Sequence, residues 1–165
     1  MSAFTILSEK VSKKAEGEEE RFLYTIGRWH TALGWLRTHI LGLEEMTEAV
    51  AIENAEIEMV YHLRDIAVGA AIMLRSLGIV DPAADFNAEY ALAATKHPGM
   101  TLDSDRHTDE SRFYALAEEV GEVCAALTYD NKADTGHNSD LISEVTQVGG
   151  LALAWLCRYQ NGEGR

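Results

Sequence analysis

The spacing of apolar residues predicts a first long helix that begins near Phe22. Apolar side chains recur there every three or four positions as far as Ile40, which is the repeat of an α-helix with one buried face. Residues 1–18 show little periodicity and mix Lys, Ser, Glu and Gly, and residues 161–165 are similarly polar. We therefore expect flexible segments at residues 1–18 and 161–165, and a single helical domain over residues 19–160.

A second apolar pattern extends from residue 43 to residue 77. Gly42 separates it from the first pattern. This pattern fits one long helix, or two helices with a break near residues 51–54. A glycine, an aspartate and a proline within residues 78–82 end it, because glycine and proline do not favour continuation of a helix. A shorter helix is expected over about residues 83–95.

Two further apolar stripes lie in the C-terminal half, over residues 113–127 and 141–159. The polar, turn-rich loop between them, residues 129–140, is long enough to reverse the chain. Several antiparallel helices with such stripes predict an all-α fold, specifically an antiparallel helix bundle. The candidate N-caps are Thr108 or Asp109 for the first of these two helices and Ser139 or Asp140 for the second.

Composition supports the helical fold and limits the partners. A chain of 165 residues with 47% hydrophobic residues has room for one core, and only two prolines interrupt helix formation. The formal net charge of −13 opposes binding to nucleic acid. No stretch approaches about 18 uncharged apolar residues, which predicts no membrane partner. Cys124 and Cys157 form no CxxC pattern and are expected to be reduced residues of a cytoplasmic protein.

Glutamates cluster on the first of the two C-terminal helices. Glu118, Glu119 and Glu122 lie on one side of it, and Glu119 lies nearest the apolar stripe. Glu144 and Gln147 flank the stripe of the last helix at i, i+3 spacing. If the two helices pack antiparallel, these residues face each other and offer the oxygen ligands that Mg²⁺ prefers, with Mn²⁺ as a substitute. The spacing alone also fits a solvated acidic helix face.

The order of these features resembles the all-α nucleoside triphosphate pyrophosphohydrolases, the MazG-like superfamily that includes the dimeric dUTPases. The resemblance covers about residues 95–160 and lies in EEVGEV (118–123), LISEVTQV (141–148) and ALAWL (152–156), which match a signature of EExxE, a polar loop and ExxD. It implies a MazG-like bundle and Mg²⁺-dependent hydrolysis of a nucleoside triphosphate to the monophosphate and pyrophosphate. By the same resemblance, the metal ligands are Glu119, Glu122, Glu144 and the residue at position 147, and the catalytic residues are Glu118 and Glu119, with Glu118 as another ligand or as the group that orients water.

Gln147 departs from this signature, which has aspartate at that position. A glutamine offers a neutral oxygen ligand and cannot act as a base. Asp140, one turn before Glu144, could supply the missing charge. Two functions stay open: a nucleoside triphosphate pyrophosphohydrolase, and a catalytically degenerate MazG-like module that binds a nucleotide or another protein. The identity of the base and sugar, or of an alarmone, is not readable from the pattern.

A stretch in the N-terminal half resembles the acidic motif. LEEMTEAVA, residues 43–51, aligns with AEEVGEVCA, residues 117–125. His62 and Asp65 follow the first stretch where Glu144 and Gln147 follow the second. A duplicated α-hairpin would produce this match, and so would a chance alignment of Glu-rich helix ends. The matched glutamates are Glu44, Glu45 and Glu48 with Glu118, Glu119 and Glu122.

Basic and aromatic residues add further expectations. Lys96 and Arg112, which precede the acidic cluster, are candidates for binding substrate phosphates or are ordinary loop and cap charges. The six histidines share no HxxxH or HExxH spacing, so the sequence predicts no zinc site. Trp29 and Trp35 are expected in the core or in an interface. The resemblance and the apolar stripes also predict a homodimer or a larger homo-oligomer.

Overall fold

Six α-helices make up the regular secondary structure in this computed structural model, which describes residues 1–45, 48–128 and 140–160. No strand occurs within these ranges, so the predicted all-α fold is confirmed. The predicted tail, residues 161–165, lies outside the described residues. The helices are α1 (Ala3–Lys14), α2 (Phe22–Glu45), α3 (Ala49–Ser76), α4 (Pro82–Lys96), α5 (Asp109–Thr128) and α7 (Leu141–Gln160).

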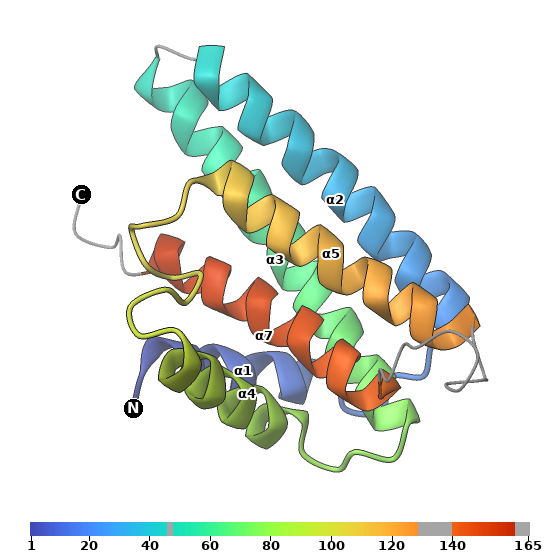
Figure 1. The fold of residues 1–165 in the computed structure, drawn as a ribbon. Helices are drawn as coiled ribbons and strands as arrows, with labels where there is room; N and C mark the ends of the chain where they lie inside the picture. Colours follow the sequence, from blue (N-terminus) through green and yellow to red (C-terminus); the bar gives the residue numbers. More distant parts are fainter. Residues whose placement is uncertain (46–47, 129–139, 161–165) are drawn as a thin grey trace.

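Four of the helices close into an antiparallel bundle (Figure 1). α2 packs against α3, α3 against α7, α7 against α5, and α5 against α2, so each helix has two neighbours in the bundle. α1 and α4 pack against each other and cover the other side of α3 and α7. Buried side chains from all six helices form one continuous hydrophobic core, which places α3 and α7 at its centre.

The predicted apolar stripes face this core. Trp29 on α2, Leu116 on α5 and Trp155 on α7 are fully buried. Burial of such stripes is the main source of stability for helices of this length, because isolated helices are marginal in water. Trp35 differs from Trp29, since it is 51% exposed on the outer side of the bundle.

The N-terminal segment corrects one prediction. Residues 3–14 form α1 instead of a flexible segment, and Phe4, Leu7 and Val11 are buried on it. The ring of Phe4 stacks on Tyr90 of α4, with the ring centroids 4.2 Å apart. These three apolar residues already have helical spacing, but their burial depends on the surface that α4 and α3 supply from later in the chain.

Helix boundaries differ from the prediction at one further place. α2 continues through Gly42 to Glu45 and α3 begins at Ala49, so neither Gly42 nor residues 51–54 interrupt a helix. A glycine costs a helix interior about 1 kcal/mol, which the burial of neighbouring residues such as Ile40 offsets. The end of α4 was predicted within one residue.

Predicted caps are present at two helix starts. The hydroxyl of Thr108 accepts a hydrogen bond from the backbone N–H of Ser111 at 3.1 Å at the start of α5. The carboxylate of Asp140 accepts one from the backbone N–H of Ile142 at 3.3 Å at the start of α7. Each bond satisfies an N–H group that a helix start leaves unpaired.

Two glycines let aromatic rings pack directly against helix backbone. A Cβ at Gly149 on α7 would lie 2.3 Å from the ring of Phe86 on α4, and a Cβ at Gly69 on α3 would lie 2.7 Å from Nε1 of Trp29. That Nε1 donates to the carbonyl of Ile66 at 3.1 Å. The contact at Gly149 holds α4 close to α7, and thereby positions the polar residues of α4.

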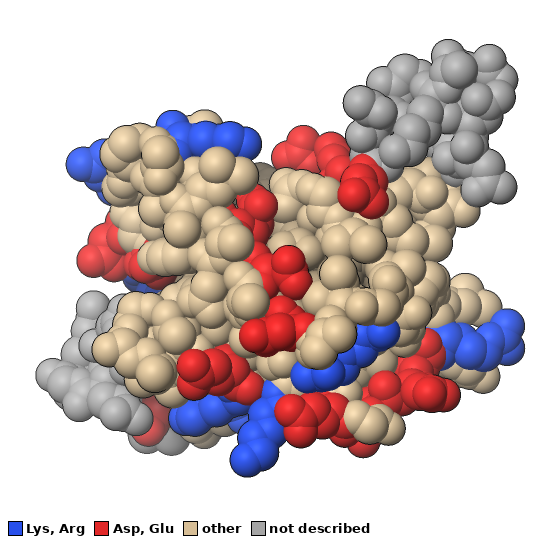
Figure 2. Space-filling model, turned by 90° about the horizontal axis from the view of Figure 1, so that it is seen from below, with Lys and Arg blue, Asp and Glu red and all other residues tan. Residues whose placement is uncertain are grey.

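The surface is strongly acidic. Figure 2 shows acidic side chains in an interrupted band across the middle of the lower face, with most Lys and Arg nearer its edges. Such a face repels polyanions at long range. None of the described helices is both long enough and apolar enough to cross a membrane.

Candidate metal centre

Three predicted carboxylates converge where α5 packs against α7. Glu119 and Glu122 project from α5 and Glu144 from α7, and one carboxylate oxygen of each lies within 4.8 Å of the others. Glu119 and Glu122 share a helix face because three residues separate them. α5 and α7 pack antiparallel (Figure 1). This packing brings Glu144 opposite the pair. The structure therefore brings together the three charged ligands of the predicted site.

The cluster concentrates negative charge in a poorly solvated place. Glu144 is only 6% exposed, Glu119 is half-buried, and Glu122 is exposed. Oε2 of Glu119 is buried and has no hydrogen-bond partner among the described residues. Burial, followed by the charges of Glu122 and Glu144, raises the pKa of Glu119 to about 7. Burial and the neighbouring Glu122 also raise the pKa of Glu144. A bound cation would stabilise the charged form of both carboxylates and so oppose both the effect of burial and the repulsion.

Gln147 lies in the same cluster. Its side-chain amide donates to Oε2 of Glu144 and to the hydroxyl of Ser143, both at 3.3 Å. Asp140 lies close enough for its charge to raise the pKa of Glu144, while its own carboxylate caps α7. The residue that replaces the signature aspartate therefore contacts the most buried carboxylate of the cluster.

A pocket of about 260 Å³ opens beside the carboxylates. Glu119 and Gln147 line it, together with α4, the segment that follows α4, and the middle of α7. Glu89 of α4 also lines the pocket, and its charge contributes to the raised pKa of both Glu119 and Glu144. Sequence reasoning missed Glu89, because only the packing of α4 on α7 brings it to the site.

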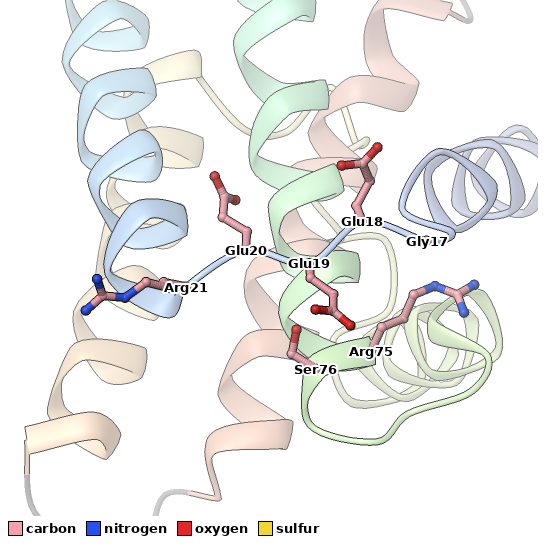
Figure 3. A pocket seen from close by; sticks show the side chains of 7 residues that line it. All are labelled: Gly17, Glu18, Glu19, Glu20, Arg21, Arg75 and Ser76. Carbon is pink, nitrogen blue, oxygen red and sulfur yellow. The ribbon is translucent and has the colours of Figure 1, made fainter.

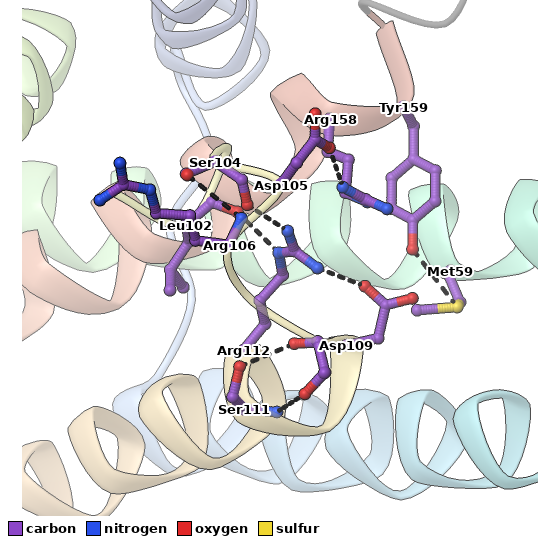
Figure 4. A network of polar contacts seen from close by, with 11 residues as sticks. Met59, Leu102, Ser104, Asp105, Arg106, Asp109, Ser111, Arg112, Arg158 and Tyr159 are labelled. Atoms are coloured by element: carbon purple, nitrogen blue, oxygen red, sulfur yellow. Dashed lines mark hydrogen bonds and ion pairs between the residues drawn. The ribbon is translucent and has the colours of Figure 1, made fainter. Parts of the chain in front are cut away.

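The two predicted phosphate-binding residues have different environments. Lys96, the last residue of α4, is exposed and lines the pocket. Arg112 is fully buried and donates to the carbonyls of Leu102 at 2.7 Å and Ser104 at 2.6 Å, and to Asp109 at 2.9 Å (Figure 4). Its guanidinium is thus engaged in fixing the segment between α4 and α5, so the predicted substrate-binding role of Arg112 is wrong.

Glu118 and the earlier motif copy lie outside this cluster. Glu118 is exposed on α5, although its charge contributes to the raised pKa of Glu119. In the earlier copy, Glu45 ends α2 and Glu48 precedes α3, whereas the later glutamates lie in the middle of α5. Asp65 is paired with Arg28. The two aligned stretches therefore do not occupy equivalent helix positions, and the duplication stays a prediction.

A larger hollow of about 680 Å³ lies between the connection of α1 to α2 and the end of α3 (Figure 3). Its charged groups form hydrogen bonds that fix the connection between α1 and α2. Glu20 accepts hydrogen bonds from Arg28 at 3.1–3.2 Å, and Arg75 donates to the carbonyl and hydroxyl of Ser12 at 3.3 and 3.1 Å. The carboxylates of Glu18 and Glu20 point away from that of Glu19 in Figure 3, so they do not converge on a common point.

Comparisons of the chain with protein families, with curated proteins and with solved structures gave no match. The assignment of a function therefore rests on the residues of the carboxylate cluster, their geometry and the pocket beside them.

Proposed function

We propose that the protein hydrolyses a nucleoside triphosphate, or a related nucleotide, to the monophosphate and pyrophosphate in a Mg²⁺-dependent reaction. The observation that carries this proposal is the convergence of Glu119, Glu122 and Glu144 within 4.8 Å, from two helices, beside a pocket. The resemblance of the two motifs to the MazG-like pyrophosphohydrolases supports the same reaction. Mn²⁺ is expected to substitute for Mg²⁺.

The donor set suits a hard divalent cation. Glu119, Glu122 and Glu144 offer only oxygen atoms, and Gln147 can present its amide oxygen after a rotation of its terminal group. Mg²⁺ is usually bound by one or two carboxylates together with water and phosphate oxygens, so the three glutamates offer enough ligands. The buried, unpartnered oxygen of Glu119 is the group that gains most from such a ligand. When bound, the ion neutralises and orients the phosphate oxygens of the substrate.

Other residues of the chain have distinct roles in this proposal. The nucleoside lies at the pocket of about 260 Å³, which is slightly smaller than the roughly 300 Å³ at which ligand pockets usually begin, so part of the nucleoside stays outside it. The ammonium group of Lys96 pairs with phosphate charge at the pocket. The exposed carboxylate of Glu118 accepts a hydrogen bond from the attacking water. The water oxygen bonds to the α-phosphorus and gives up a proton to the carboxylate of Glu118, which passes it to solvent. The bond from that phosphorus to the bridging oxygen breaks, and pyrophosphate leaves with the bonding electron pair.

Gln147 favours a second function, in which the protein binds a nucleotide and performs no chemistry. Its amide contacts Glu144 where a second carboxylate would hold the metal more strongly. In that case nucleotides bind in the pocket and no pyrophosphate forms. Binding measured by calorimetry, alongside product analysis, separates the two functions.

We also propose that the protein acts as a cytoplasmic homodimer or larger homo-oligomer. Its two cysteines are free thiols, which suits a reducing compartment. Large apolar side chains are exposed along α2 and α3, including Leu23, Tyr24, Trp35 and Tyr61. Exposed apolar surface of this kind is typical of interfaces between copies of a chain. Size-exclusion chromatography with light scattering measures the mass directly.

Pyrophosphate release from a panel of ribonucleoside and deoxynucleoside triphosphates, with Mg²⁺, Mn²⁺ or EDTA, tests the main proposal. Glu122→Gln is the matched variant, because Glu122 is exposed and its replacement leaves the core intact. We expect metal-dependent release by the natural chain and its loss in the variant.

A further inference from the structure

A second group of metal-binding side chains lies between α2 and α3. His39 on α2, and Glu58 and His62 on α3, each offer one ligand atom, and these atoms lie within 4.8 Å of one another. Glu58 and His62 are one helical turn apart and therefore share a face of α3. α2 and α3 pack antiparallel (Figure 1). This packing places His39 opposite them. None of these residues belongs to the carboxylate site.

Aromatic contacts hold both imidazole rings in place. Trp35, one turn before His39, stacks on His62 with ring centroids 6.1 Å apart and 3° between the planes. The centroids of Trp35 and His39 lie 6.2 Å apart, and those of the two imidazoles lie 5.9 Å apart. Tyr61 contacts the ring of His62 edge-on. This packing restricts the rings, and preorganised ligands bind metals with a smaller entropic cost.

The imidazole nitrogens of this cluster are free to bind a ligand. No hydrogen bond between described residues involves a ring nitrogen of His39 or His62, although both rings are half-buried. His30, also on α2, differs because its Nδ1 bonds to the carbonyl of Ile26 at 2.9 Å. Buried polar groups are usually satisfied by the protein or by ordered water, and no nitrogen of His39 or His62 is a buried atom without a partner. The two adjacent imidazoles therefore have water or a bound ion as their partner.

We propose that His39, Glu58 and His62 bind a transition-metal ion, with Zn²⁺ as the ion that best suits the ligands. Two imidazole nitrogens and one carboxylate are typical zinc ligands, and they leave a fourth position for water. Mg²⁺ and Ca²⁺ prefer sites made of oxygen alone, so this site differs in chemistry from the carboxylate cluster. Zn–N bonds of about 2.0–2.1 Å place tetrahedral ligand atoms roughly 3.4 Å apart, which modest side-chain rotations would achieve.

No local sequence motif indicates this site, because its ligands come from two helices. Glu58 and His62 have i, i+4 spacing, but neither histidine has a second histidine one turn away on its own helix. Only the packing of α2 on α3 pairs them. The HxxxH and HExxH motifs, in which both histidines belong to one helix, therefore do not describe it.

Co²⁺ titration of the untagged protein tests the proposal, because tetrahedral Co²⁺ with nitrogen ligands absorbs visible light. The titration uses the Glu119→Gln/Glu122→Gln double variant with excess Mg²⁺, so that the carboxylate cluster does not contribute. We expect one equivalent of Co²⁺ to produce the absorption, and Zn²⁺ to displace it. Absence of Co²⁺ binding would not contradict the proposed hydrolase activity, because that activity depends on other residues.

His39→Phe and His62→Phe are the informative variants, since phenylalanine keeps a ring against Trp35 and removes the nitrogen ligands. We expect each to weaken Co²⁺ and Zn²⁺ binding by at least about tenfold, a loss of about 1.4 kcal/mol, with unchanged helical circular dichroism. Glu58→Gln should weaken binding less, and His30→Ala should not change it. Absence of the Co²⁺ absorption, or equal affinity in both Phe variants and His30→Ala, would show that the rings serve only in packing.

Discussion

The side-chain amide of Gln147 donates to Oε2 of Glu144 at 3.3 Å. A neutral donor thus faces the most buried carboxylate of the cluster, which is only 6% exposed. This contact eases the repulsion among the glutamates when no cation is bound. It also occupies an oxygen that a metal ion would use, so Gln147 links metal affinity to the stability of the protein.

Gln147→Asp should therefore have opposite effects with and without metal. Without added metal, a further carboxylate beside Glu144 should lower the free energy of unfolding, because like charges repel in a poorly solvated place. With Mg²⁺, the added ligand should raise metal affinity by roughly tenfold. Gln147→Asn is the matched control, since it has the size of aspartate without its charge. Urea unfolding and calorimetry with Mg²⁺ measure the two effects, and equal behaviour of both variants would remove Gln147 from the site.

Stability should depend on pH through Glu119. Its pKa is raised from 4.5 to about 7 in the folded protein, so between these values the folded state binds more protons than the unfolded state. The free energy of unfolding should therefore fall as pH rises through this interval. Stabilisation by Mg²⁺ should grow over the same interval, because protons compete with the metal for the carboxylates.

Thermal unfolding at pH 5, 6, 7 and 8, with and without Mg²⁺, measures this behaviour. Glu119→Gln should flatten the pH dependence and reduce the Mg²⁺ effect. A Mg²⁺ effect of equal size at every pH would contradict the assignment of Glu119 as a ligand.

Arg112→Met should destabilise the protein strongly. The variant leaves the carbonyls of Leu102 and Ser104 and the carboxylate of Asp109 without their donor, and removal of one partner of a buried charged pair costs about 3–5 kcal/mol. Urea unfolding measures the loss. Arg106→Ala, at an exposed residue of the same segment, is the control and should cost less than about 0.5 kcal/mol. Similar losses in both variants would argue against a structural role for Arg112.

Alanine at two helix glycines should shift stability in opposite directions. Gly149→Ala places a Cβ 2.3 Å from the ring of Phe86 and should cost about 1–3 kcal/mol through overpacking. Gly121→Ala, where nothing lies within 4 Å of the added Cβ, should stabilise α5 by up to about 1 kcal/mol. Chemical denaturation measures both values. A stabilising Gly149→Ala would show that α4 does not pack tightly on α7.

The carboxylate cluster could be predicted because each half of it lies on one periodic helix. The stripe Leu116–Val120–Val123 fixes which way Glu119 points, and the stripe around Val145 does the same for Glu144. The antiparallel arrangement of the two helices was predicted from the polar, turn-rich sequence of residues 129–140, of which residues 129–139 lie outside the described residues. The apolar stripe of each helix and the spacing of its glutamates were therefore enough to predict that Glu119, Glu122 and Glu144 lie close together.

Features that depend on contacts between distant segments were missed. Glu89 reaches the site only because α4 packs on α7, and His39 meets His62 only because α2 packs on α3. α1 carries a helical stripe at Phe4, Leu7 and Val11, but the surrounding Lys, Ser and Glu residues obscured it. Arg112 looked available for phosphate because its three acceptors cannot be identified from the sequence.

Phosphorus-31 NMR of the reaction with Mg²⁺ tests the central proposal most directly, because it distinguishes cleavage at the α-phosphorus from cleavage at the γ-phosphorus. We expect at least one nucleoside triphosphate to give monophosphate and pyrophosphate, with a rate reduced about 100-fold or more in Glu122→Gln and abolished by EDTA. No product from any nucleotide, release of inorganic phosphate with a diphosphate, or an unchanged rate in Glu122→Gln would contradict it.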